Sequence, residues 1–266
     1  MGLTTPVVGI VGGTGKMGAW MARLLEKRGL SVLRAGRRTE LTPAEMAQKS
    51  DVVVVSVPIA DTERVIREIG PLVPEEGLLM DLASLKAGPV AAMLEYSRAQ
   101  VVGLHPLFGP EVTSDRDLRV AVCPGRGESG RKWIMEILLE EGMKTVVLDP
   151  QRHDQLMGLV QGVNHLSTLA LADCIRRSGF GREELIDGST LTFEQRLDRI
   201  TAMFRQSATL FGSLLMNNPA AEGPMENYLQ SVKRLMQIVQ SGDQQAFEDL
   251  YDSLKEYFGV KGSIGG

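Results

Sequence analysis

The pattern of apolar and polar positions divides the chain into two halves that meet near residue 150. In the first half, short runs of valine, leucine and isoleucine alternate with amphipathic stretches of helical period. The apolar runs cover 7–11, 31–35, 51–57, 78–82, 101–104, 120–123 and 145–148, and the clearest amphipathic stretches are 17–27, 61–69 and 129–141. Near-continuous apolar strands that alternate with helices are typical of a parallel sheet covered on both faces. We therefore predict a doubly wound α/β domain over residues 1–150.

The second half lacks such runs and carries long helical patterns rich in leucine, methionine and alanine. These patterns cover 151–177, 192–216, 225–240 and 244–258, and Asp243 stands where the N-cap of the last helix would be. Small and flexible apolar side chains suit close helix packing, within one chain or across a dimer. We predict an all-helical domain over residues 151–266.

Composition narrows the possible function classes. The 266 residues include 29 Lys and Arg against 33 Asp and Glu, a net charge of −4. This balance disfavours a general nucleic-acid or anionic-membrane binder, which would need a basic face. No apolar run approaches the roughly 20 residues that span a bilayer, and the N-terminus lacks a signal-peptide pattern, so we expect a cytoplasmic protein. Cys123 and Cys174 lie far apart, and no metal-ligand spacing occurs, so no metal is expected.

A glycine-rich segment follows the first predicted strand and leads into the first predicted helix. Gly13, Gly15 and Gly18 have the G-x-G-x-x-G spacing, with Lys16 and Met17 between the last two. In a dinucleotide-binding loop the first two glycines let the backbone approach a pyrophosphate, and the third lets helix and strand pack closely. The N–H groups at the helix start then meet the phosphate charge. We therefore interpret the first domain as a Rossmann-type domain that binds its cofactor through these five residues.

The end of the second predicted strand indicates which dinucleotide is bound. An NAD site usually places Asp or Glu about 20 residues beyond the glycines, to accept hydrogen bonds from the ribose hydroxyls. Here the strand is followed by Gly36, Arg37 and Arg38, and the next carboxylate is Glu40. Two guanidinium groups suit the 2′-phosphate of NADP, although two solvated surface arginines would give the same sequence. We expect NADP, with NAD as the alternative.

Four further segments fall at strand ends or on the first helix of the second half, where a doubly wound sheet binds its ligand. They are Ser56-Val-Pro58-Ile, Asp81-Leu-Ala-Ser84-Leu-Lys86, Gly103-Leu-His105-Pro-Leu-Phe-Gly-Pro-Glu111, and the helix with His153-Asp154 and Asn164-His165. Together with the glycine loop, these segments resemble the prephenate dehydrogenase family over nearly the whole chain. The resemblance implies oxidative decarboxylation of prephenate, or of its amino analogue arogenate, with hydride transfer to NAD or NADP in tyrosine biosynthesis. It also implies a single-function dehydrogenase without a mutase or regulatory domain, which forms a homodimer through its helical domain.

The resemblance assigns the chemistry to individual side chains. Removal of hydride from C4 of prephenate, while the C4 hydroxyl loses its proton, would leave a dienone, so CO₂ departs and the ring aromatises. His105 is expected to accept that proton, as a histidine with a pKa near neutrality can. Ser84 is expected to hydrogen-bond both the histidine and the substrate hydroxyl. Ser56 and Pro58, at the end of the third predicted strand, are expected to contact the cofactor.

Other positions carry a functional and a structural interpretation. His165 matches a family histidine on the substrate side of the helical domain, and Phe211 fits an apolar wall against the ring. His153 matches a histidine that we count with the substrate site, although it could serve only to tie its helix to the first domain. Glu111 follows the histidine segment, where family members gate the site, and an exposed loop carboxylate is the alternative.

One position departs from the family pattern. The family holds a substrate carboxylate with an arginine on a long helix of the second domain, and an ungapped alignment puts Ala202 there. Arg199 and Arg205 lie three residues to either side and are our candidates for this role, with Arg196 as a further one. The substrate therefore stays open among prephenate, arogenate and 4-amino-4-deoxyprephenate. Two other classes also stay open: a β-hydroxyacid dehydrogenase or imine reductase, and a non-catalytic NADP-sensing dimer.

Overall fold

The computed structural model describes residues 5–109 and 117–260, and its first half is built on a sheet. The strands are β1 (Val8–Val11), β2 (Val32–Ala35), β3 (Val52–Val55), β4 (Leu78–Asp81), β5 (Gln100–Pro106), β6 (Arg119–Arg126) and β7 (Lys144–Val147). The helices between them are α1 (Lys16–Lys27), α2 (Pro43–Gln48), α3 (Ile59–Ile69), the 3₁₀ turn η1 (Gly70–Leu72), α4 (Ala87–Tyr96) and α5 (Ser129–Glu140). Every predicted apolar run overlaps one of these strands.

The predicted fold class is confirmed, but the sheet is mixed rather than wholly parallel. Its strand order is β2-β1-β3-β4-β5-β6-β7, and β1 to β5 are parallel to one another. By contrast, β6 pairs antiparallel with β5, and β7 pairs parallel with β6, so the last two strands run in reverse. The sequence has no amphipathic stretch between the runs at 101–104 and 120–123. A parallel pair would need a crossover connection there, usually a helix, whereas an antiparallel pair does not.

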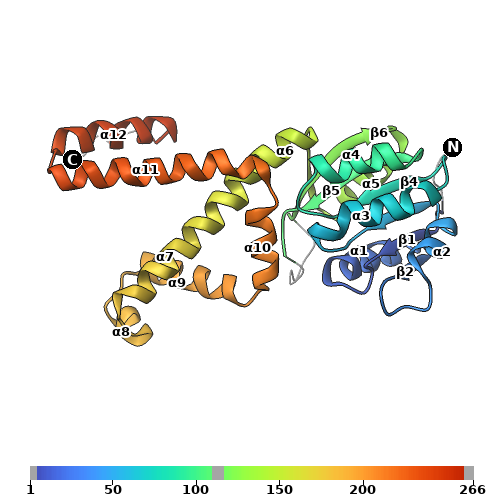
Figure 1. Ribbon diagram of the computed structural model, residues 1–266, viewed down its shortest axis with the longest axis horizontal. Helices are drawn as coiled ribbons and strands as arrows, with labels where there is room; N and C mark the ends of the chain where they lie inside the picture. Colours follow the sequence, from blue (N-terminus) through green and yellow to red (C-terminus); the bar gives the residue numbers. More distant parts are fainter. Residues whose placement is uncertain (1–4, 110–116, 261–266) are drawn as a thin grey trace.

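Helices cover both faces of this sheet (Figure 1). On one face α1 and α5 pack against the strands through a cluster that includes Trp20 and Ile134. On the other face α2, α3 and α4 do so through Met46, Ile66 and Met93. Because both faces are covered, β1, β3 and β4 are buried at every position, which explains their continuous apolar runs.

The second half is helical throughout the part that the structure describes. Its elements are α6 (Pro150–Met157), the π-helical segment η2 (Gly158–Val163), α7 (Asn164–Ser178), α8 (Arg182–Asp187), α9 (Leu191–Phe204), α10 (Ala208–Met216), the 3₁₀ turn η3 (Pro219–Ala221), α11 (Glu222–Ser241) and α12 (Gln244–Tyr257). The helix predicted over 192–216 is two helices, because the backbone is extended at Ser207. Asp243 caps α12 as predicted, since its carboxylate accepts a hydrogen bond from the Ala246 N–H at 3.0 Å.

The helical half is open in shape. Figure 1 shows α11 and α12 as a hairpin that projects away from the sheet, while α7 runs on a diverging course toward α8. In the single chain, α7, α8, α11 and α12 contain no buried residue. No helix among the described residues is both long and apolar enough to cross a membrane.

Candidate active site

The glycine loop packs tightly between β1, β3 and α1. Gly12 has a positive φ of 78°, and a Cβ there would lie 2.1 Å from the carbonyl oxygen of Ser56. A Cβ on Gly18 would lie 2.3 Å from the carbonyl oxygen of Gly12. Larger residues would therefore push the loop off the ends of the strands. Gly15 is the N-cap of α1 and is exposed, so the start of this helix is open to an anionic group.

The segment after β2 presents two free guanidinium groups. The Thr39 hydroxyl accepts a hydrogen bond from the Gly36 N–H at 2.8 Å, which closes the turn around Arg37 and Arg38. Both arginines are exposed, and neither forms an ion pair or hydrogen bond with another described residue. The end of β2 thus carries two cations that are unpaired among the described residues, and no carboxylate, so it can receive an anionic group.

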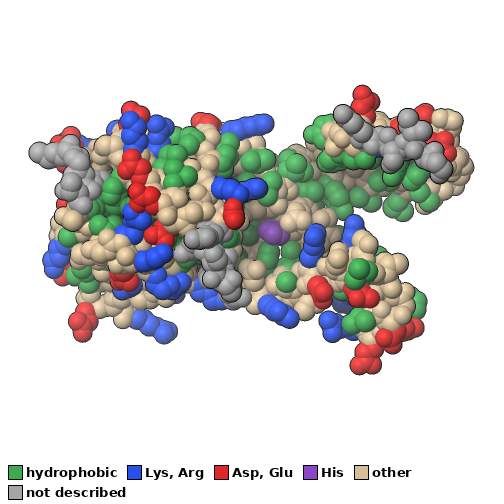
Figure 2. Space-filling view, turned by 180° about the vertical axis from the view of Figure 1, so that it is seen from behind, with side chains coloured by type: hydrophobic (Ala, Val, Ile, Leu, Met, Phe, Trp, Pro, Cys, Tyr) green, Lys and Arg blue, Asp and Glu red, His purple; other side chains and the backbone are tan. Residues whose placement is uncertain are grey.

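A pocket of 320 Å³ lies where the sheet domain meets the helical domain. Its polar lining comes from Ser84 after β4, His105 on β5, Gln161 on η2, His165 on α7 and Gln206 before α10. Its apolar lining includes Met17, Phe108, Met157, Leu210, Phe211 and Leu214. Figure 2 shows a histidine in the hollow between the two domains. The volume and the mostly apolar wall suit a small ring with a few polar substituents.

Behind the pocket, three side chains form a hydrogen-bonded relay. His105 Nδ1 lies 2.9 Å from His153 Nε2, and His153 Nδ1 lies 2.8 Å from Asp154 Oδ1. The Asp154 carboxylate also accepts the backbone N–H of Lys86 at 2.8 Å and of Ala87 at 2.9 Å. Because these oxygens act as acceptors, the His153 proton lies on Nδ1, and His153 Nε2 accepts from the His105 Nδ1–H. The lone pair of His105 is thereby left on Nε2.

The surroundings of His105 keep its ring neutral. Its side chain is almost completely buried, and burial lowers the pKa of His105 well below its usual value. The neighbouring His153 and the Lys86 ammonium lower this pKa further. Gln161 Nε2 lies 3.4 Å from His105 Nε2, on the pocket side of the ring. His105 can therefore accept a proton from a group in the pocket.

A buried ion pair between Lys86 and Asp81 lies next to His105. The Lys86 ammonium donates to Asp81 Oδ2 at 2.5 Å and to the carbonyl oxygen of Leu104 at 2.7 Å, and both charged side chains are fully buried. Burial raises the pKa of the Asp81 carboxyl, and the Lys86 ammonium opposes that rise. Lys86 thus links the ends of β4 and β5 directly beside His105. The sequence analysis included Asp81 and Lys86 in a motif but gave neither residue a role. Two opposite charges five residues apart in an otherwise apolar segment were the signal that could have predicted a buried ion pair.

The helical side of the pocket carries His165 and Phe211. His165 is half-buried, its ring meets Phe211 edge-on at a centroid distance of 4.9 Å, and burial lowers its pKa. Its Nδ1 is buried and has no hydrogen-bond partner among the described residues. An unpaired polar nitrogen beside an aromatic wall is available to a ligand, because a buried polar atom without a partner is costly.

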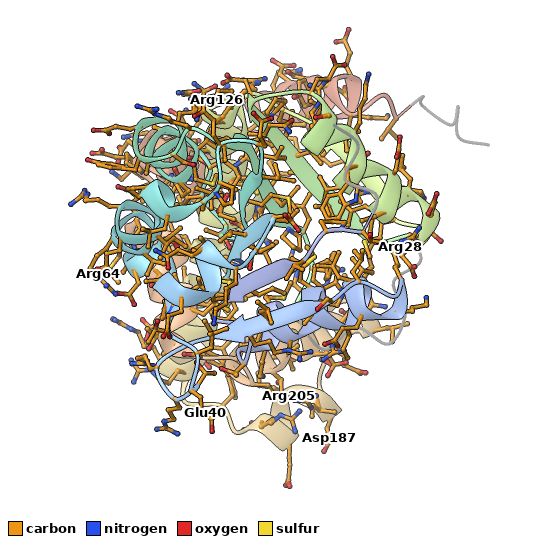
Figure 3. The ribbon with its side chains drawn as sticks, turned by 90° about the vertical axis from the view of Figure 1, so that its right-hand side faces the viewer. Arg28, Glu40, Arg64, Arg126, Asp187 and Arg205 are labelled. Atoms are coloured by element: carbon orange, nitrogen blue, oxygen red, sulfur yellow. The ribbon has the colours of Figure 1, made fainter. Side chains whose placement is uncertain are left out.

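Several predicted residues lie elsewhere. His153 is fully buried in the relay and is not part of the pocket lining, so its placement favours the structural alternative. Arg196, Arg199 and Arg205 are exposed and do not line the pocket, and Figure 3 shows Arg205 beyond the β2 edge of the sheet. No lysine or arginine belongs to the described lining. Glu111 lies outside the described residues.

The relay and the pocket contain no metal-binding cluster. In residues 5–109 and 117–260, no group of three or more His, Cys, Asp or Glu side chains is placed to hold an ion. Cys123 is buried, and burial raises the pKa of its thiol to about 12, which makes it a poor nucleophile. Of the described groups, His105 therefore remains the candidate base.

Comparison with known proteins identifies relatives of both domains. A family model described as prephenate dehydrogenase, nucleotide-binding domain, matches residues 28–146, and one described as prephenate dehydrogenase, dimerization domain, matches 149–256. The T-protein of Enterobacter agglomerans is 30% identical over 96% of this chain and 68% of its own length. A probable arogenate/prephenate dehydrogenase of Methanocaldococcus jannaschii is 30% identical over 98% of this chain and 63% of its own. The chain thus spans about two thirds of these relatives.

Solved structures share the two-domain plan. The prephenate dehydrogenase from A. aeolicus, in complex with hydroxyphenyl propionate and NAD+, superposes with a TM-score of 0.76 at 18% identity, covering 98% of this chain and 100% of its own. The Synechocystis arogenate dehydrogenase gives 0.74 at 16% identity, covering 94% and 98%. At these identities the likeness concerns the fold.

Proposed function

Because the chain belongs to the prephenate dehydrogenase family of NAD(P)-dependent oxidoreductases, we propose that it oxidatively decarboxylates prephenate to 4-hydroxyphenylpyruvate. The observation that carries this proposal is the relay, which leaves a neutral histidine with its lone pair facing a pocket at the domain junction. The family assignment sets aside the β-hydroxyacid dehydrogenase and imine reductase alternatives.

In this proposal the pocket residues divide the work by position. His105 Nε2 takes the proton of the C4 hydroxyl, and Ser84 hydrogen-bonds the same oxygen. His165 supplies a hydrogen bond to a polar substituent, and Phe211 packs against the ring. Loss of CO₂ from C1 returns an electron pair to the ring, and the proton held on His105 goes back to the phenolate oxygen.

NAD(P), when bound, supplies the hydride acceptor. The residues that would hold it belong to the glycine loop and the start of α1, or follow β3: Gly13, Gly15, Lys16, Met17, Gly18, Ser56 and Pro58. We favour NADP because Arg37 and Arg38 are unpaired among the described residues and no carboxylate stands at the end of β2. The relatives do not decide this point, since one carries NAD+ and a yeast relative is described as NADP-dependent.

The helical domain supports a homodimer. Its family model is described as a dimerization domain, and α11 and α12 expose Leu229, Leu235, Met236, Val239, Phe247, Tyr251, Leu254 and Tyr257. Figure 2 shows apolar side chains along this hairpin. So much exposed apolar surface on helices without a buried residue is typical of an interface between subunits. We assign residues 1–150 to cofactor binding and 151–266 to the substrate and the dimer; β7 ends at Val147 and α6 begins at Pro150.

The substrate carboxylates need a cation that the described lining lacks. Arg205 directly precedes Gln206, which lines the pocket, whereas Arg199 lies farther back on α9. We therefore place the carboxylate contact at Arg205. Arg205→Met should raise KM for the substrate several-fold with little change in KM for the cofactor, and Arg199→Met is the matched control. Equal effects of the two substitutions would remove Arg205 from the site.

A substrate-by-cofactor matrix tests the proposal. Prephenate, arogenate and 4-amino-4-deoxyprephenate are each mixed with NAD and NADP, and the absorbance of the reduced nicotinamide is followed. We expect the highest kcat/KM for prephenate with NADP. Reduction with arogenate or the amino analogue alone would change the substrate. Absence of reduction in all six mixtures, with NADP binding intact, would favour a non-catalytic NADP-sensing dimer.

A further inference from the structure

The π-helical segment η2 sets which side chains of one long helical rod face the sheet domain. Residues four apart on an α-helix drift around its axis, since 3.6 residues complete a turn. A segment with i→i+5 bonding has more residues in each turn and cancels that drift. Accordingly His153, Met157, Gln161 and His165, each four residues apart, all point the same way: His153 contacts His105, and the other three line the pocket.

The opposite face of η2 is held in place. A Cβ on Gly158 would lie 2.7 Å from the carbonyl oxygen of Ala220, and one on Gly162 would lie 3.1 Å from the Ala221 Cβ. Both glycines are buried against the turn η3. Gln161 is thus presented to the pocket from a backbone that is packed closely on its other side.

The relay determines which end of the Gln161 amide faces His105. Because His105 Nε2 carries a lone pair, the group 3.4 Å away must donate, so Gln161 presents its NH₂ rather than its carbonyl oxygen. A substrate hydroxyl that donates to His105 Nε2 would bring its oxygen within reach of this NH₂. Apo hydrogen bonds of this kind are often long and shorten when substrate binds.

We propose that Gln161 selects a hydroxyl over an amine at C4 of the substrate, an inference that rests on the proposed function. A hydroxyl oxygen donates one proton and keeps lone pairs for the Gln161 N–H. As its proton passes to His105 and hydride leaves C4, that oxygen becomes a carbonyl oxygen and, after loss of CO₂, a phenolate. The negative charge therefore grows where the Gln161 N–H points, which strengthens the hydrogen bond during the reaction.

An amine at C4 meets the same donor unfavourably. As an ammonium it has only N–H donors, so one of them faces the Gln161 NH₂. The Ser84 hydroxyl can donate or accept and does not distinguish the two groups. An unmet donor in a closed site costs roughly one to two powers of ten in binding or rate. Gln161 is thus the described group that distinguishes a hydroxyl from an amine at C4.

The test compares Gln161→Met and Gln161→Glu with wild type on prephenate and 4-amino-4-deoxyprephenate. Gln161→Met keeps the length and removes the donor, so kcat/KM for prephenate should fall about 10- to 100-fold, mostly in kcat, with little change for the amine. Gln161→Glu presents acceptors only and should shift the ratio toward the amine. Equal losses on both substrates, with an unchanged Tm, would overturn the proposal, as would no loss on prephenate.

A binding measurement separates this inference from the proposed function. Calorimetric titration with 4-hydroxyphenylpyruvate and 4-aminophenylpyruvate needs no turnover. The aniline nitrogen is neutral, but its lone pair is delocalised into the ring and accepts hydrogen bonds weakly. Wild type should therefore bind the phenol about tenfold more tightly than the aniline, and Gln161→Met should bring the two affinities together. Wild type that binds this way without reducing cofactor would refute the proposed activity alone. Equal affinities in wild type would refute the role of Gln161 alone.

Discussion

Replacement of Asp154 by Asn tests the relay with the smallest possible change. Asp154 accepts three hydrogen bonds, from the N–H groups of Lys86 and Ala87 and from His153. An amide of the same shape can offer only one oxygen. His153 and the Lys86 N–H share Oδ1, so an NH₂ at that position opposes the Lys86 N–H as well. The proton of His153 must then move to Nε2, which forces the proton of His105 onto its own Nε2. The lone pair of the base then faces away from the pocket.

The magnitude follows from what is lost. In that orientation kcat for Asp154→Asn should fall by about 10²–10⁴-fold, the contribution of a general base, with KM for the cofactor unchanged. The other amide orientation keeps the oxygen toward His153 and Lys86 and therefore preserves kcat. It sets NH₂ against the Ala87 N–H and leaves a buried donor unmet, at about 1–3 kcal/mol of unfolding free energy. For a chain of this size, Tm should drop by roughly 2–4 °C per kcal/mol.

Asp149→Asn is the matched control. Asp149 is the N-cap of the same helix and accepts the N–H groups of Gln151 and Arg152 outside the relay. Asn caps a helix as well as Asp, so activity and Tm should stay near wild type. Initial rates come from the absorbance of reduced nicotinamide, and Tm from thermal denaturation. If Asp154→Asn kept kcat within threefold of wild type and also left Tm unchanged, Asp154 would neither hold the relay nor set the tautomer of His105.

Three further predictions concern charge. The acid limb of kcat/KM should lie below pH 6.5, because burial, the adjacent histidine and the Lys86 ammonium all lower the pKa of His105; a limb at or above 6.5 would contradict its neutral state. Arg37→Ala combined with Arg38→Ala should raise KM for NADP far more than for NAD, and equal increases would make both arginines plain surface charge. Lys86→Met should cost about 3–5 kcal/mol in denaturant unfolding, because it strands a buried carboxylate; a loss below 1 kcal/mol would show that this carboxyl is already neutral.

Local patterns were enough to predict the sheet and the cofactor loop. Each strand run is apolar because both faces are covered, and Gly18 must be glycine because the Gly12 carbonyl lies against it. These constraints act within a few residues of one another, so they are visible along the chain. The sequence motifs also brought His105, Ser84 and His165 to one pocket.

The remaining features depend on contacts between distant segments. The reversal of β6 agrees with the lack of an amphipathic stretch between the apolar runs at 101–104 and 120–123, a signal that is easily overlooked. The π-helical segment η2 cannot be recognised from the spacing of apolar residues, yet it orients Gln161 toward His105. The pairing of Lys86 with Asp81 depends on how two strand ends meet, and the interval between them does not reveal it.

The carboxylate of Asp154 also fastens the two domains together. The carboxylate reaches from α6 to two backbone amides at the start of α4. The backbone carbonyl oxygen of Asp154 accepts a hydrogen bond from the Asn218 side-chain amide at 2.9 Å. Local opening of this junction would break the hydrogen bonds that fix the tautomer of His105 while the sheet is still folded. Hydrogen exchange at the Lys86 and Ala87 amides would then report the fraction of molecules in which the relay is formed. Activity in mild denaturant would be lost at a lower concentration than the sheet.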